Sequence, residues 1–342
     1  MLRILESLWH IPNPSRADLA RELHLDRSTI GLLVDQMIDR GILRQHAEES
    51  SGPRGGRPPI LLTISPGVAY SLGVELTYPN IRLAAVDLCG SLIGSREIPI
   101  QDYGPQAIEN LAAETARYRA TLDASFKEGG LGLVTLGVGV SGQIADDGRS
   151  ILISHALHIS EPLNVADPLE RALQVPVTLL NDAQAGVMRE AGLRDKEDLL
   201  LIIIEFRPGN AEEDIGIGAG LVMGNKLCHG RAITHLLRSN LNALPSDPAL
   251  GVEGLGKSLA LVANITGIDE IVLGGEVEDI LIPLGEIVDR YSKVGRNREE
   301  TIIRVSHING GSEAVALGAA YSAMKLLLAS HDSSVANFFA SL

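Results

Sequence analysis

Cysteine is scarce in this chain: only Cys89 and Cys228 occur among its 342 residues, and they lie far apart in the sequence. This scarcity excludes a disulfide framework and is typical of a cytoplasmic protein in a reducing compartment. No apolar run reaches the roughly 18 to 20 residues that a membrane-spanning helix needs, so we expect no membrane partner. The first residues carry Arg3 and Glu6 and soon meet Pro12, a pattern that differs from that of a signal peptide.

Lysine is absent from Met1 to Pro66, a segment in which eight arginines stand against eight aspartates and glutamates. The segment is therefore neutral, and the net charge of −14 lies wholly beyond it. Hydrophobic residues make up 45% of the chain, which excludes a disordered protein, and the length predicts two or three domains. These contrasts predict a small N-terminal domain joined to a much larger acidic body.

The N-terminal segment has the pattern of a helix-turn-helix. Leucines at helical spacing predict a first helix that Pro12 ends, and Ser15 is placed to cap a second, with Asp18 in the capping-box position. A third helix is predicted from Arg27 to Arg40, and Gly41 ends it. In such a motif the outer face of this helix enters the major groove of DNA. The residues expected to contact operator DNA from it are Arg27, Ser28, Thr29 and Gln36.

Two short strands are predicted next, at Ile42 to Ala47 and Ile60 to Ile64, and the loop from Ser51 to Pro59 joins them as a wing. Arg54 and Arg57, on this glycine-rich backbone, suit insertion into the negative minor groove of DNA. A winged helix that only contacts other proteins is the alternative. A neutral DNA-binding domain binds weakly unless it is doubled, so the charge count favours a homodimer or a homotetramer.

Beyond Tyr70 the pattern changes to strands and helices that occur in two successive rounds. A three-stranded meander, a long helix and a further strand are predicted first, at 71–76, 81–87, 91–98, 105–128 and 133–140. The same rhythm restarts at Leu199, and a last helix is predicted from Ala314 to Leu328. Two such rounds indicate a duplicated α/β fold with a ligand cleft between its lobes. The predicted domains are 1–66, 67–190 and 191–342.

Five motifs occur in an order and spacing that are specific together, although each alone is a weak signal. They are Gly55–Pro59, Leu136–Gly142, Leu180–Ala185, Gly216–Gly220 with Asn225–Leu227, and Ile271–Gly275. In these motifs the chain resembles, over nearly its whole length, the ROK family (repressors, open reading frames and sugar kinases). The resemblance implies an N-terminal winged helix-turn-helix followed by a duplicated, actin-like (sugar kinase/ribonuclease H-like), two-lobed α/β body.

The chain departs from the kinases of this family at the loop that would hold ATP. Those kinases have an Asp-x-Gly-Gly-Thr type loop, whose backbone amides cradle phosphates, but this sequence has Glu75 to Asn80 there. Tyr78 brings a side chain where the backbone should approach phosphate, and Pro79 has no N–H to donate. We therefore expect no ATP or other cofactor and no kinase activity. The glycines from Asp214 to Gly220 fit either a tight strand connection or nucleotide contact.

The resemblance also implies a structural zinc site, built in the family from a histidine and a three-cysteine cluster. His235 matches the histidine, but residues 236–247 contain no cysteine, so no metal is expected. The family's glutamate that holds sugar hydroxyls, three residues before this histidine, is replaced by Ala232. That replacement removes one sugar contact of the usual binding pose.

The pair Asn181-Asp182 is the best preserved polar part of the sugar site that the resemblance implies. In the family's kinases this aspartate is the general base that takes a proton from the sugar hydroxyl, so Asp182 is expected here as a vestigial base that binds sugar. The other interpretation is an N-cap for a helix that starts at Ala183, and both roles are compatible. His155 and His158 are candidates with an equally open structural interpretation. The expected ligand contacts are Asn181, Asp182, His235, His155 and His158.

These observations favour a DNA-binding regulator, most simply a repressor, that responds to a small-molecule sugar or sugar phosphate. Lobe closure on the ligand would change the spacing of two DNA-binding domains in a dimer, over half-sites about one helical turn (~34 Å) apart. Two alternatives stay open. One is an active ATP-dependent sugar kinase with a DNA-binding extension, and the other is a ligand-free, constitutive DNA-binding or scaffolding protein.

Overall fold

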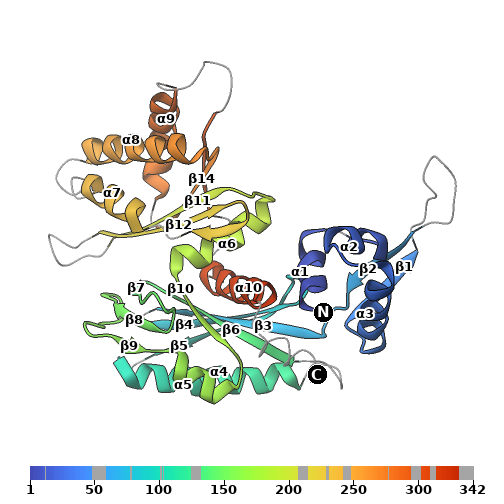
Figure 1. The fold of residues 1–342 in the computed structure, drawn as a ribbon. Helices are drawn as coiled ribbons and strands as arrows, with labels where there is room; N and C mark the ends of the chain where they lie inside the picture. The colour runs from blue at the N-terminus through green and yellow to red at the C-terminus, as the bar shows by residue number, and fades with distance from the viewer. Residues whose placement is uncertain are drawn as a thin grey trace.

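The computed structural model describes residues 1–11, 13–47, 59–77, 79–100, 102, 104–124, 132–206, 215–228, 231–241, 248–275, 277–293, 302–308 and 313–330. In this part of the chain a small helical domain with a two-stranded ribbon precedes two five-stranded sheets and a smaller three-stranded one (Figure 1). None of the helices described is long and apolar enough to span a bilayer.

The N-terminal domain is a winged helix-turn-helix, as predicted. Its elements are α1 (Leu2–His10), α2 (Arg16–Glu22), α3 (Arg27–Asp39), β1 (Leu43–Ala47) and β2 (Ile60–Ile64). Ser15 and Asp18 form the predicted capping box of α2, and Gly41 follows α3 with a φ of 71° that favours glycine. Strands β1 and β2 pair antiparallel and so anchor the wing at both ends. The wing residues Arg54 and Arg57 lie outside the described residues.

The first lobe is built on a mixed sheet in the order β10-β6-β3-β4-β5. Its strands are β3 (Ala69–Leu76), β4 (Asn80–Asp87), β5 (Leu92–Pro99), β6 (Gly132–Val140) and β10 (Val177–Asn181). The meander from β3 to β5 is antiparallel, whereas β6 and β10 pair in parallel after long crossovers. The helices α4 (Gly104–Asp123) and α5 (Ala166–Leu173) cover one face and complete its hydrophobic core (Figure 1).

A three-stranded antiparallel sheet between β6 and α5 is missing from the sequence prediction. Its strands are β7 (Gln143–Ile144), β8 (Ser150–Ile153) and β9 (Leu163–Asn164). They are only two to four residues long, so none contains enough alternation to be recognised from the sequence. The turn between β8 and β9 carries His155 and His158.

The second lobe repeats the strand arrangement of the first, in the order β13-β12-β11-β14-β15. Its strands are β11 (Leu199–Phe206), β12 (Ile215–Met223), β13 (Lys226–Cys228), β14 (Glu270–Gly275) and β15 (Arg304–His307). Three helices accompany this sheet: α7 (Arg231–Leu241), α8 (Pro248–Thr266) and α9 (Glu278–Ser292). An antiparallel meander followed by two parallel strands recurs in both lobes, which agrees with the predicted duplicated fold.

Each half of the chain contributes its last helix to the sheet of the other half. Helix α6 (Asp182–Arg194) packs on β12, where a Cβ added to Gly220 would lie 2.0 Å from the Ala183 carbonyl oxygen. Helix α10 (Ala314–Ala329) packs on β3 and β6 of the first sheet, where a Cβ on Gly137 would lie 2.0 Å from the Ala319 carbonyl oxygen. The two helices also pack on each other and so form the connection between the lobes (Figure 1).

The N-terminal domain shares a hydrophobic core with the first lobe and α10. Buried side chains of α1 belong to one cluster with Leu88, Met324 and Leu327. Trp9, the only tryptophan of the chain, donates from Nε1 to the Leu88 carbonyl oxygen at 2.7 Å, and its ring centroid lies 4.9 Å from that of Tyr321. A continuous apolar core of this kind holds the domain against the body more firmly than a linker alone.

Candidate functional site

Asn181 and Asp182 lie where β10 ends and α6 begins. Asn181 is the N-cap: its side chain accepts a hydrogen bond from the Ala183 N–H at 3.1 Å, and Gln184 completes a capping box. The expected helix start at Ala183, with Asp182 as the cap, is therefore wrong by one residue, because asparagine and aspartate cap equally well. Asp182 is instead the first residue of α6, only 8% exposed, and its Oδ1 accepts from the Ala183 N–H at 2.7 Å.

The amide of Asn181 also ties β10 to the turn that follows β6. Its Nδ2 donates to the Gly142 carbonyl oxygen at 3.0 Å. Ser154, directly after β8, donates from Oγ to the Ser141 carbonyl oxygen at 2.5 Å. His155 is the next residue and is exposed. Hydrogen bonds thus join the segment of His155 to the polar pair at the start of α6.

Gly218 of β12 brings the second lobe against this polar pair. A Cβ added to Gly218 would lie 3.1 Å from Asp182 Oδ1 and 3.5 Å from Asn181 Oδ1. Gly216, Gly218 and Gly220 all lie in β12, and the last two let α6 approach the sheet closely. The glycines therefore allow close packing inside a strand and do not form a tight connection between strands, whereas Asp214 itself lies outside the described residues.

The three candidate histidines are all exposed. His155 and His158 share the turn after β8, in which the His158 N–H donates to the His155 carbonyl oxygen at 3.2 Å. His235 lies on α7, in the second lobe, and the side chain of Ala232 on the same helix falls outside the description. No cluster of three potential metal ligands occurs among the residues that the structure describes, which include His235 but not 242–247.

The stretch from Glu75 to Asn80 is a short connection between two antiparallel strands. β3 ends at Leu76 and β4 begins at Asn80, while Tyr78 between them lies outside the described residues. Glu75 pairs across the strands with Arg82, whose Nη1 is 3.0 Å from Glu75 Oε2. The charge of Arg82 is thus already neutralised by a carboxylate, which leaves it poorly suited to hold a phosphate.

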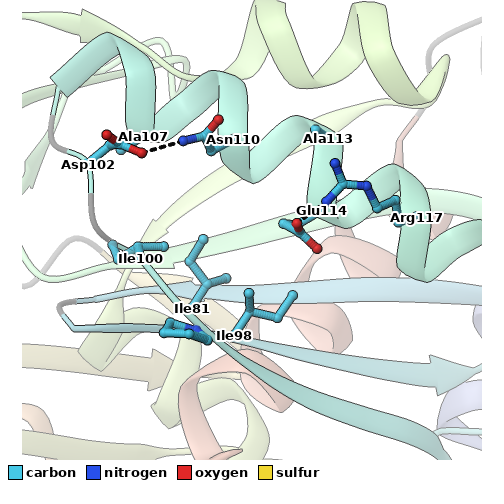
Figure 2. Close-up of a pocket in the computed structure, with 10 residues that line it drawn as sticks. Ile81, Ile98, Ile100, Asp102, Ala107, Asn110, Ala113, Glu114 and Arg117 are labelled. Atoms are coloured by element: carbon cyan, nitrogen blue, oxygen red, sulfur yellow. Dashed lines mark hydrogen bonds and ion pairs between the residues drawn. The ribbon is translucent and has the colours of Figure 1, made fainter.

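A cavity of about 310 Å³ lies between α4 and the ends of β4 and β5. Figure 2 shows apolar side chains on its strand side, from Ile81, Ile98 and Ile100, and polar side chains along the helix. Asn110 of α4 donates there to Asp102 Oδ2 at 2.5 Å. None of the predicted ligand contacts lines this cavity, so it is separate from the sugar site that the sequence predicts.

Helix α3 carries four of the predicted DNA contacts. Arg27, Ser28 and Gln36 are exposed, and Thr29 is half-buried. Asp26 caps this helix and accepts hydrogen bonds from the Ser28 hydroxyl and from the Thr29 N–H and hydroxyl, the last two at 2.8 and 2.6 Å. These bonds, with the Ser28 hydroxyl first, hold the pKa of Asp26 well below its usual range. The two hydroxyls therefore order the helix start as well as facing outward.

The roles of three residues are missing from the sequence prediction: those of Ser141 and Gly142, which it names only within the motif Leu136–Gly142, and that of Trp9. Ser141 and Gly142 act through backbone carbonyl oxygens, which leave no signal in residue type. Trp9 had a signal, since it is the only tryptophan and lies on the first predicted helix. A large aromatic side chain on a small domain indicates a contact with a neighbouring body.

Two family models match the chain. Residues 72–237 match the ROK family, and residues 1–51 match the MarR family. The first match begins in β3 and ends in α7, so it spans the first lobe and part of the second. The second covers the helix-turn-helix.

Several curated relatives are regulators by name. The xylose repressor of Staphylococcus xylosus is 24% identical over 229 residues, 67% of this chain and 56% of that repressor. The DNA-binding transcriptional dual regulator NagC of Escherichia coli is 20% identical over 221 residues, 64% of this chain and 50% of NagC. The chain thus spans about half the length of the curated relatives that it matches.

Solved structures share the fold. A ROK family transcriptional regulator, described as a homologue of the E. coli Mlc protein, superimposes with a TM-score of 0.71 at 17% identity, covering 100% of this chain and 98% of the other. The ROK hexokinase of Thermus thermophilus gives a TM-score of 0.57 at 20% identity, covering 74% and 97%. The Streptomyces griseus ROK glucokinase, in complex with glucose and AMPPNP, gives 0.52 at 18%, covering 74% and 99%. The kinases align with less of the chain than the regulator does.

Proposed function

Because this chain carries a ROK family domain behind a MarR-type helix-turn-helix, we propose that it is a transcriptional regulator whose DNA binding responds to a sugar. The proposal rests on two features that occur in one chain. One is the winged helix-turn-helix, and the other is the buried carboxylate of Asp182, between the end of β10 and Gly218 of the second lobe. Repression is the simplest mode, and the names of the curated relatives make D-xylose the first effector to test.

The sugar binds at the start of α6. Asp182 accepts hydrogen bonds from its hydroxyls, as a group that no longer acts as a base. Asn181 orders the turn at Gly142, and His155 and His158 contact the ligand from the first lobe. His235 approaches from the second lobe. A ligand that contacts both lobes prefers one lobe arrangement, which is the condition for shifting an equilibrium between two states.

The DNA-binding domain works in pairs, in a homodimer or homotetramer in the cytoplasm. Arg27, Ser28, Thr29 and Gln36 lie in the major groove of the operator, while Arg54 and Arg57 of the wing enter the minor groove. The neutral charge of residues 1–66 supports pairing, because one neutral domain gains little from the phosphate backbone. Lobe movement then alters the spacing of the two domains relative to half-sites about 34 Å apart.

Thermal shift against a panel of D-xylose, D-glucose, N-acetylmannosamine and their phosphates tests the effector site. A sugar at 100 times its Kd adds about 2.7 kcal/mol of stability. We expect Asp182→Asn to abolish this shift, since it keeps an acceptor for the Ala183 N–H but removes the charge. Asp195→Asn, the same substitution at the exposed other end of α6, is the matched control and keeps the full shift. A shift that survives Asp182→Asn removes this residue from the site.

We further propose that the body has no kinase activity. Pro79 offers no N–H to a phosphate, and the charge of Arg82 is taken up by Glu75. The assay is ATP-dependent phosphorylation of the same sugars. Measurable turnover that Asp182→Asn abolishes would establish the rival function, a sugar kinase with a DNA-binding extension.

A further inference from the structure

Helix α10 contacts all three parts of the molecule. Its N-terminal half packs on the first sheet, and Gly318 lies so close to α6 that an added Cβ would be 2.0 Å from the Ala185 carbonyl oxygen. Its C-terminal half joins the core of the DNA-binding domain through Met324, Leu327 and Leu328. A polar side chain near this end can therefore interact with both the second lobe and the DNA-binding domain.

Lys325 is that side chain. Its ammonium donates to the Asn225 carbonyl oxygen at 2.8 Å, across 100 residues of sequence. Asn225 lies in the tight turn between β12 and β13 with a φ of 62°, and its N–H donates to the Glu197 carbonyl oxygen at 2.9 Å. The adjacent Gly224 N–H donates to Asp198 Oδ1 at 2.7 Å. The turn is therefore fixed to the second lobe, and the hydrogen bond of Lys325 depends on the position of that lobe.

Helix α1 packs directly on α10, and Glu6, half-buried on α1, attracts the Lys325 ammonium electrostatically. Burial lowers the pKa of Lys325, and the Glu6 carboxylate opposes this by favouring the charged ammonium. The Asn225 carbonyl oxygen accepts from one of the three N–H donors of this half-buried ammonium, and the Glu6 carboxylate stabilises its charge from a longer distance.

We propose that Lys325 is a coupling residue, which links the second lobe, through the Asn225 carbonyl oxygen, to the DNA-binding domain, through Glu6. The inference rests on the proposed function, because it names the route by which a sugar between the lobes reaches the DNA. A hydrogen bond holds only over a range of about 0.5 Å in donor–acceptor distance, so a lobe rotation breaks the contact with Asn225. Freed from this acceptor, the ammonium moves toward Glu6 and shifts α1 relative to α10.

The test compares full-length Lys325→Met, Lys325→Arg and Lys293→Met. Methionine keeps the apolar stem without the charge, and arginine keeps a cationic donor. Lys293 is an exposed lysine directly after α9, and it pairs locally with Asp289. The measured quantity is the ratio of operator Kd values with and without saturating D-xylose. We expect a ratio of about 5 or more in the wild type and in Lys293→Met, below about 2 in Lys325→Met, and partial recovery in Lys325→Arg. A Lys325→Met protein with the wild-type ratio overturns the proposal.

Hydrogen–deuterium exchange without sugar or DNA separates this inference from the proposed function. If Lys325 links the two parts, Lys325→Met raises exchange both in α1 and in the turn around Asn225, which belong to different parts of the molecule. Lys293→Met leaves exchange in both segments unchanged. Glu6→Gln raises exchange in α1 alone. If the wild type shows no sugar response but Lys325→Met shows this paired change, the link stands and the sugar proposal fails. Unchanged exchange in both segments refutes the link whatever the sugar does.

Discussion

The amide of Asn181 serves two structural purposes, and removing it has a calculable effect. Asn181→Ala eliminates the N-cap of α6 and the 3.0 Å hydrogen bond from Nδ2 to the Gly142 carbonyl oxygen. Loss of an N-cap costs about 1 kcal/mol, and loss of one neutral hydrogen bond about 1 more. We therefore expect a loss of roughly 2 kcal/mol in the free energy of unfolding, which corresponds to a fall in Tm of about 3 °C for a chain of this length.

Asn181→Asp keeps the N-cap of α6 but removes the hydrogen bond to the Gly142 carbonyl oxygen, so it tests the two roles separately. Aspartate caps a helix as well as asparagine does, but its carboxylate cannot donate to the Gly142 carbonyl oxygen. We expect stability within about 1 kcal/mol of the wild type, together with at least a tenfold loss of sugar affinity, because the turn at Ser141 and Gly142 is no longer held. Urea denaturation gives the first quantity and isothermal titration the second. Wild-type sugar affinity in Asn181→Asp would refute the reasoning that this hydrogen bond orders the site.

Other predictions concern the lobe connection and the DNA contacts. Arg194→Met removes the shorter ion pairs of the buried carboxylates of Glu190 and Glu270, at 2.9 and 2.6 Å, and leaves only longer ones at 3.9 and 3.7 Å; we expect it to cost about 3 kcal/mol in urea denaturation. The exposed Arg117→Met should cost less than about 1 kcal/mol. Gly220→Ala has no room for a Cβ, so we expect no soluble folded protein from this variant. Gly285→Ala is the control: the nearest atom to its Cβ is 3.8 Å away, and the substitution should stabilise α9 by up to about 1 kcal/mol. A soluble Gly220→Ala protein that unfolds cooperatively would contradict the packing. Arg57→Ala is expected to weaken operator binding and to reduce its salt dependence by about one counterion, and an unchanged salt slope would remove the wing from the interface.

Local signals were sufficient for the elements of the DNA-binding domain. The predicted third helix ends one residue later than α3, and the two predicted wing strands match β1 and β2 within one residue. The capping box at Ser15 and the glycine after α3 are short-range features, because each depends on the backbone within four residues. Helix ends and caps of this kind can be predicted from the sequence.

The packing of helices on particular sheets could not be predicted from the sequence in the same way. The last helix is predicted within one residue of α10, but nothing in its own pattern shows that it packs on the sheet of the first lobe. The close contacts of Gly137 and Gly220 mark this exchange only once the partner backbone is known. The predicted boundary between residues 190 and 191 stays a prediction; it falls within α6, which packs on the sheet of the second lobe.

The candidate site was located through its resemblance and refined by hydrogen bonds. Asn181 and Asp182 could be named from their motif, but which of them caps α6 depends on a one-residue difference in the helix start. The contacts of Gly142 and Ser141 involve carbonyl oxygens, which every residue has. The coupling through Lys325 joins segments 100 residues apart and follows from the tertiary fold alone.

The most direct measurement of sugar-controlled DNA binding is a pair of reciprocal titrations. Fluorescence anisotropy gives the Kd for an operator selected from random DNA, with and without saturating D-xylose or the sugar that the thermal-shift panel selects. Calorimetry gives the sugar Kd with and without that operator. Linkage requires the two ratios to be equal, and we predict a common value of about 5 or more. Superimposable titrations, for a sugar that does stabilise the protein, would contradict a regulator whose effector site and DNA-binding domain are coupled.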